Sequence, residues 1–124
     1  MRIIPDEKQP SAAIEIPLEK PLPDYDLHEL EHPTPRDVDA ILVTQGFRDL
    51  LDDARGVLTD LLSGTGFEIA QLTGAICPSD DESYRPGLWI VIRDTHAASG
   101  RDLPSESRTR ISATTEELIK RIGL

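Results

Sequence analysis

The sequence predicts an α+β domain in which two or three helices pack against a small antiparallel sheet. Three observations indicate this class. Residues 46–62 have the apolar period of an amphipathic helix, two apolar stretches of strand character follow at 67–77 and 88–92, and a capped helix ends the chain. Helix, neighbouring strands and helix in this order are typical of an α+β fold.

The first thirty-six residues differ in composition from the rest. They hold seven of the ten prolines, each of which removes an amide donor and fixes its own backbone angle. We therefore expect residues 1–36 to form an extended or partly disordered arm and residues 37–124 to form one domain. Ile14, Ile16 and Leu18 alternate with Glu15 and Pro17 at the period of a strand. They are the predicted partner-binding residues, because this segment could lie along a sheet edge.

A helix is expected to begin after Thr34, which is a good N-cap, with Pro35 at the first helical position and Asp37 at its positive end. Residues 38–42 and 47–62 present their apolar side chains on nearly opposite sides of a helical wheel. One straight helix cannot bury both sets, so we predict a break at 44–46. A short strand at 40–44 is the alternative, since this segment is rich in β-branched residues.

Two strands are expected after the long helix. Glycines at 64 and 66 end the helix, and residues 67–77 form a strand with a bulge or bend at Gly74. A polar turn then leads to Leu88–Ile92, five apolar residues that indicate a central strand covered on both faces. Residues 94–110 are predicted to be a loop, and a capping box at Thr114–Glu117 is predicted to begin the last helix.

Two strands do not make a stable sheet, because an isolated hairpin is marginal in water. The third strand could come from residues 40–44, from the N-terminal arm around 14–18, or from a second chain. This shortage of strands predicts either a homodimer or a protein partner that supplies or accepts a strand.

Charge and composition limit the classes of function. The chain has 124 residues and a formal charge of −10, which disfavours nonspecific contact with nucleic acid or with an anionic membrane. It has no apolar run long enough to cross a bilayer, and its single cysteine, Cys77, cannot form an intrachain disulfide. We therefore expect a cytoplasmic protein.

One motif points to metal chemistry. His28, Glu29 and His32 have the spacing in which two histidines bind zinc and the glutamate activates a water molecule. That arrangement needs a continuous helix, but Pro33 follows directly and biases His32 away from helical angles. A zinc-dependent hydrolase is therefore kept as an alternative, while no cofactor, metal or catalytic residue is part of the main prediction.

A second alternative concerns an arginine-rich segment. Arg101, Arg108 and Arg110 stand among serines and threonines in the predicted 101–110 loop, which is the one locally basic patch of an acidic chain. Such a patch could bind an anionic ligand. The main prediction remains a small acidic protein–protein interaction module without catalytic activity, such as an inhibitor, neutralising, regulatory or accessory subunit.

Overall fold

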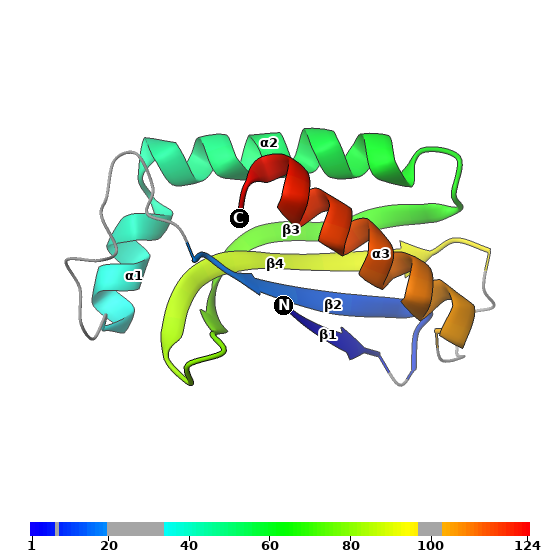
Figure 1. Ribbon diagram of the computed structural model, residues 1–124, viewed down its shortest axis with the longest axis horizontal. Helices are drawn as coiled ribbons and strands as arrows, with labels where there is room; N and C mark the ends of the chain where they lie inside the picture. The colour runs from blue at the N-terminus through cyan, green and yellow to red at the C-terminus, as the bar shows by residue number, and fades with distance from the viewer. Residues whose placement is uncertain (7, 20–33, 97–102) are drawn as a thin grey trace.

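The computed structural model describes residues 1–6, 8–19, 34–96 and 103–124. In these residues four antiparallel strands form one sheet, and three helices pack against it (Figure 1). The strands are β1 (Arg2–Pro5), β2 (Ser11–Pro17), β3 (Phe67–Pro78) and β4 (Tyr84–Asp94), in the spatial order β1-β2-β4-β3. The helices are α1 (Pro35–Leu42), α2 (Gln45–Leu62) and α3 (Ser105–Ile122). The predicted α+β class is confirmed.

The third strand, for which the sequence left three sources open, comes from the N-terminal region. Two segments of the predicted arm, β1 and β2, belong to the sheet, so the sheet needs residues on both sides of position 36. β2 is not an edge strand, because it lies between β1 and β4, with Ile14 opposite Ile90 and Ile16 opposite Leu88. Pro17 is tolerated there because it is the last residue of the strand.

The two consecutive helices agree with the predicted break. Thr34 caps α1 in a capping box with Asp37: its hydroxyl accepts from the Asp37 N–H at 3.3 Å, and its own N–H donates to the Asp37 carboxylate at 2.9 Å. Thr44 caps α2 in turn, accepting from the Phe47 N–H at 3.3 Å. The alternative of a strand at 40–44 is wrong, because α1 extends to Leu42.

Two predicted boundaries also differ from the structure. β3 runs through Gly74 without interruption, and its irregularity lies between Ile69 and Gln71, where the register with β4 shifts. The last helix begins at Ser105 rather than after Thr114, so residues 105–110 are helical and not part of a loop. Thr115 is buried inside that helix, and its hydroxyl donates to the Ile111 carbonyl at 2.8 Å.

α2 and α3 cover one face of the sheet, and α1 lies at one end of it (Figure 1). Leu88, Ile90 and Ile92 of β4 are fully buried beneath the helices, and β2 adds Ile14 and Ile16 to the same layer.

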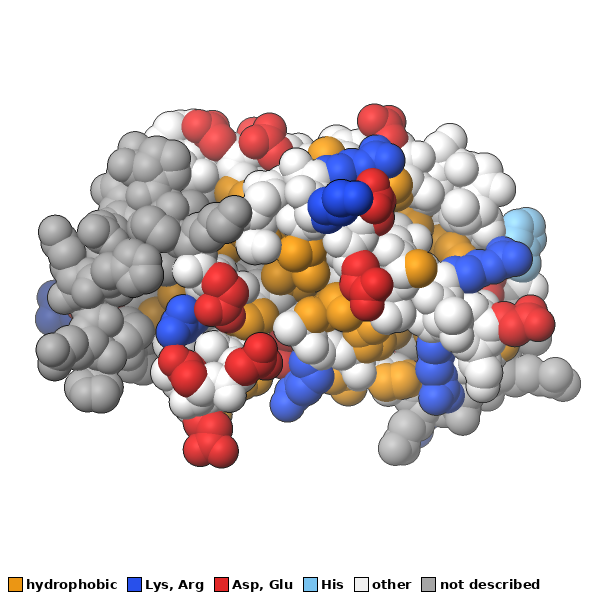
Figure 2. Space-filling model, in the orientation of Figure 1, with side chains coloured by type: hydrophobic (Ala, Val, Ile, Leu, Met, Phe, Trp, Pro, Cys, Tyr) orange, Lys and Arg blue, Asp and Glu red, His pale blue; other side chains and the backbone are white. Residues whose placement is uncertain are grey.

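Acidic side chains line the α2 border of the helical face (Figure 2). No described helix is long and apolar enough to cross a membrane.

The central position predicted for residues 88–92 is confirmed, since β4 pairs with β2 on one side and β3 on the other. Its two faces differ, however. Trp89 and Val91 alternate with the buried residues of β4, so they lie on the face opposite the helices, and both are partly exposed. In the described parts of the chain, helices cover only one face of this strand.

Candidate functional site

The edge of β3 that faces away from β4 is the candidate site. β3 is twelve residues long, about twice the usual strand length, and β4 pairs with one of its sides only. Within the described residues no strand lies on the other side. A long unpaired edge of this kind is a template on which another chain can form a strand.

Backbone direction along this edge follows from the register. The Leu18 N–H donates to the Pro86 carbonyl at 2.9 Å, so Pro86 directs its carbonyl away from β3. Ile76 stands opposite Pro86 and therefore directs its N–H and C=O to the free edge. Because the direction alternates along a strand, Gly74 and Leu72 do the same.

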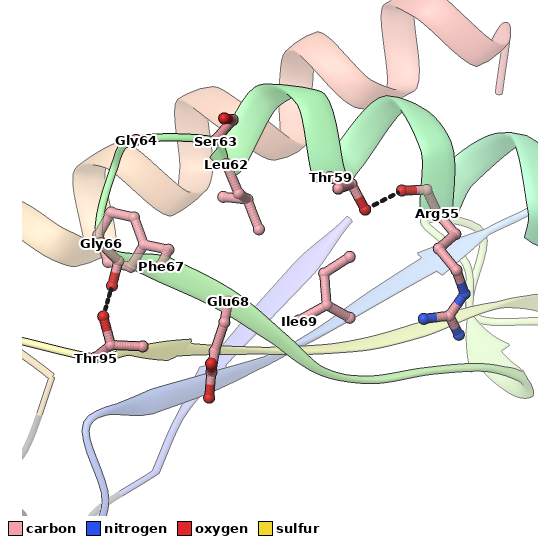
Figure 3. A pocket seen from close by; sticks show the side chains of 10 residues that line it. All are labelled: Arg55, Thr59, Leu62, Ser63, Gly64, Gly66, Phe67, Glu68, Ile69 and Thr95. Atoms are coloured by element: carbon pink, nitrogen blue, oxygen red, sulfur yellow. Dashed lines mark hydrogen bonds between the residues drawn. The ribbon is translucent and has the colours of Figure 1, made fainter.

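α2 forms a groove with the first residues of β3. The core side of α2 buries Ala54, Leu58 and Leu62, which turns the neighbouring stripe, Arg55 and Thr59, toward β3 (Figure 3). The space between helix and strand has a volume of about 490 Å³. It is lined by residues of α2, the turn after it, β3 and the residue that follows β4: Arg55, Thr59, Leu62, Ser63, Gly64, Gly66, Phe67, Glu68, Ile69 and Thr95.

One end of the groove is closed by a turn that requires glycine. Gly66 has a φ of +83°, and an added Cβ would lie 2.1 Å from the His96 ring. Its carbonyl accepts from both the N–H and the hydroxyl of Thr95, at 2.8 and 2.6 Å. These bonds fix the start of β3 against the end of β4, so this wall of the groove is held in place by hydrogen bonds.

The groove is apolar at its centre and basic along the helix. Phe67, Ile69 and Leu62 supply its apolar surface, and the Arg55 side chain extends from α2 toward β3 beside Ile69 (Figure 3). Arg55 makes no ion pair within the described residues. Glu68 points to the other side of β3 and is paired with Arg93.

A second arginine lies on the same side of α2. Arg48 precedes Arg55 by seven residues, which is two helical turns and a rotation of about 20°, and its side chain is exposed. The helix also carries four aspartates. Asp52, Asp53 and Asp60 line a groove between α2 and α3, which Thr59 lines as well, and Asp49 accepts from the Gln45 side-chain amide at 2.9 Å. On the helical wheel Asp52 lies about 40° from Arg48. The side of α2 that faces the β3 edge therefore carries two arginines and has one aspartate at its border.

The opposite edge of the sheet, formed by β1, is a weaker candidate for pairing with another strand. β1 has only four residues, and the groove between it and α3, about 520 Å³, is lined by Ile3, Pro5, Arg108, Thr109, Ser112, Ala113 and Glu116. The Arg108 Nε donates to the Leu103 carbonyl at 3.2 Å, which ties this side chain to its own helix terminus. A short edge gives a partner strand few backbone groups to bind.

The residues predicted to bind a partner or an anion do not form such sites in the structure. Ile14, Ile16 and Leu18 are buried in this chain's own core, with at most 2% of their surface exposed, and are not available to a partner. Arg108 and Arg110 are exposed on the first turns of α3, not on a loop. Arg101 lies outside the described residues, so the three arginines are not brought together as one described patch.

The zinc motif also falls outside the described residues. His28, Glu29 and His32 lie in the segment 20–33, and the zinc-dependent hydrolase stays a prediction. In the parts of the chain that the structure describes, no group of three or more histidine, cysteine, aspartate or glutamate side chains could hold a metal ion.

The acidic turn between β3 and β4 is internally bonded. Asp81 accepts from the Ser79 hydroxyl at 2.9 Å, from the Ser83 N–H at 3.1 Å, and from the Ser83 hydroxyl, and it pairs with Arg85 at 2.8 Å. These hydrogen bonds, with a smaller contribution from Arg85, hold the pKa of Asp81 well below its ordinary value. The carboxylate thus closes the hairpin turn.

Arg55 and Thr59 were not singled out from the sequence. A helical wheel shows that they flank the apolar side of residues 46–62, but it does not show which neighbour that flank faces. Comparison of the chain with protein-family models, with curated proteins and with solved structures found no match in any of the three.

Proposed function

We propose that this protein is a small, non-catalytic interaction module that binds an extended segment of a partner protein as an additional strand beside β3. The observation that carries the proposal is the free edge of β3, which directs backbone groups outward at Leu72, Gly74 and Ile76, with the α2 groove over residues 67–69 at the start of the strand. In strand addition, main-chain hydrogen bonds supply affinity, and pockets for alternate side chains supply specificity. The β3 edge offers main-chain groups that can form such hydrogen bonds, and the groove offers a pocket for a side chain.

The expected affinity is moderate. Each main-chain hydrogen bond contributes about 1 kcal/mol net, and an apolar side chain that fills the groove beside Phe67 and Ile69 contributes about 1.5–3 kcal/mol. Ordering a flexible segment opposes both gains. Four or five hydrogen bonds with one or two apolar anchors therefore correspond to a dissociation constant on the order of micromolar.

A second copy of the chain is a poorer occupant of this edge. Two-fold pairing of β3 with β3 would bring the α2 helices of both copies together along the sides that carry Arg48 and Arg55. Like charges placed opposite each other oppose association. We therefore expect the free protein to be monomeric by light scattering.

A library of random twelve-residue peptides displayed on phage, selected against the immobilised full chain, tests the proposal. We expect enriched sequences with apolar residues at alternate positions. Thr59→Trp should fill the groove from an exposed helical position and weaken peptide binding, measured by fluorescence polarisation, at least tenfold. Thr109→Trp on α3 is the matched control, since both threonines are exposed and donate to a carbonyl four residues earlier, at 2.7 Å for Thr59 and 3.1 Å for Thr109.

Strand addition has a further signature in the peptide backbone. Only every second residue of the added strand bonds to β3, so N-methylation of an enriched peptide should weaken binding at alternate amides and not at those between. The proposal is overturned if no peptide is enriched, if neighbouring amides are equally sensitive, or if Thr109→Trp and not Thr59→Trp blocks binding. A stable dimer that Thr59→Trp dissociates would also overturn it, because a second copy would then be the occupant.

A further inference from the structure

We infer that the segment added beside β3 carries an aspartate or glutamate side chain that binds Arg55. The inference rests on the proposed function, because it concerns the chemistry of the segment that occupies the same groove. It specifies the partner more closely: an extended, mainly apolar peptide with a single carboxylate at the position that passes beneath α2.

The first observation that supports this inference is the position of Arg55. Its backbone lies on α2, and its guanidinium reaches down over the β3 edge, where an added strand would run (Figure 3). Ile69 of β3 and Leu62 of α2 line the same groove, so a bound peptide would remove water from around the guanidinium. A desolvated arginine without a counter-ion is unfavourable, whereas a carboxylate can accept two parallel hydrogen bonds from it.

No described carboxylate of this chain forms an ion pair with Arg55. Glu68, the one acidic residue that lines the groove, is paired with Arg93 and points to the other side of β3. Asp52, Asp53 and Asp60 line the groove between α2 and α3, and none of them forms an ion pair with Arg55. Arg48, two turns before Arg55, adds a second positive charge on the same side of the helix. The local charge is therefore complementary to an acidic group on the partner.

The charge of the whole chain limits how acidic that partner segment can be. At a formal charge of −10, the protein repels a strongly acidic peptide at long range. A single carboxylate between apolar residues avoids most of this repulsion and still meets Arg55 at short range. We therefore expect enriched peptides to hold one aspartate or glutamate at a fixed distance from their apolar anchor, and not an acidic run.

Charge exchange between protein and peptide tests the inference. Arg55→Glu should weaken binding of an enriched peptide about tenfold, and replacing the peptide's carboxylate residue with lysine should restore binding to that variant. Arg55→Gln, which keeps a polar side chain without charge, should give a smaller loss. Arg110→Glu is the matched control, because it makes the same change at an exposed helical arginine outside the groove. Circular dichroism should show that all three variants fold, since both arginines are exposed.

The outcomes separate the inference from the function on which it rests. Enriched peptides without a carboxylate, or binding that Arg55→Glu leaves unchanged while Thr59→Trp abolishes it, would overturn the inference and leave strand addition standing. Equal losses for Arg55→Glu and Arg110→Glu would also overturn it, because the effect would then be one of net charge. Failure to enrich any peptide would overturn the proposed function itself.

Discussion

At the scale of single residues, Cys77 shows how burial changes the chemistry of a side chain. The thiol is fully buried, and its Sγ lies 3.6 Å from the Leu88 carbonyl. Burial, with a smaller contribution from the negative charge of Glu15, raises the pKa of Cys77 from its ordinary value near 9.0 to about 11. Since the thiolate is the reactive form, the fold lowers the reactivity of this cysteine at neutral pH.

Two measurements follow for Cys77. With an aromatic disulfide reagent at pH 8, the native protein should react at least roughly a hundredfold more slowly than the urea-unfolded chain, because the two pKa values differ by about two units. Between pH 9 and 11 the unfolded chain loses the thiol proton and the native state keeps it, so the free energy of unfolding should fall as pH rises. Cys77→Ala should remove this part of the pH dependence. Fast labelling of the folded protein would contradict the burial.

At the scale of elements, the contact between β4 and β2 depends on one glycine. A Cβ at Gly87 would lie 2.3 Å from the Ile16 carbonyl oxygen and 2.9 Å from Cys77 Sγ. The first contact is with backbone, so a larger residue must move one strand away from the other. By contrast, a Cβ at Gly56, in the middle of α2, would meet nothing within 4 Å.

These two glycines make a matched pair for substitution. Gly87→Ala should lower the free energy of unfolding by about 1–3 kcal/mol, because overpacking separates β4 from β2. Gly56→Ala should raise it by about 0.5–1 kcal/mol, because alanine favours an exposed helix interior. Urea unfolding followed by circular dichroism measures both. A neutral effect at Gly87 would show that the two strands are less closely packed than the structure indicates.

The first half of α3 shows why the start of this helix was not predicted from the sequence. Its buried face is formed by Ser107, Ile111, Thr115 and Leu118, which have helical spacing but include two hydroxyl residues. The Ser107 hydroxyl donates to the Asp94 carboxylate at 2.8 Å, which compensates for its burial. No side chain caps the helix after Pro104. Neither an apolar stripe nor a start signal is therefore visible at 105–113.

At the scale of the whole molecule, the N-terminal residues are part of the core. Ile14, Ile16 and Leu18 are buried by β4 and the helices, and each contributes about 1.5–3 kcal/mol by burial alone. Their sum is comparable to the total stability of a small domain, about 5–15 kcal/mol. The sheet therefore cannot be expected to persist without β2.

Truncation tests this directly. A variant that lacks residues 1–18 should show no cooperative urea transition by tryptophan fluorescence of Trp89, because it loses β1, β2 and their contribution to the core. A variant that lacks residues 1–5 should keep a cooperative transition at lower urea, since β1 is a short edge strand whose side chains are partly or fully exposed. A cooperative transition in the shorter fragment would place the boundary of the folding unit after β2.

The sequence by itself determined the local elements of this protein. Capping residues and apolar periods are short-range signals, so the α+β class, the break before α2 and the central strand at 88–92 could all be predicted. Only the tertiary structure decided which segments meet. The insertion of β2 between β1 and β4, and the placement of Arg55 over the edge of β3, depend on contacts between residues far apart in the chain, and no local pattern encodes such contacts.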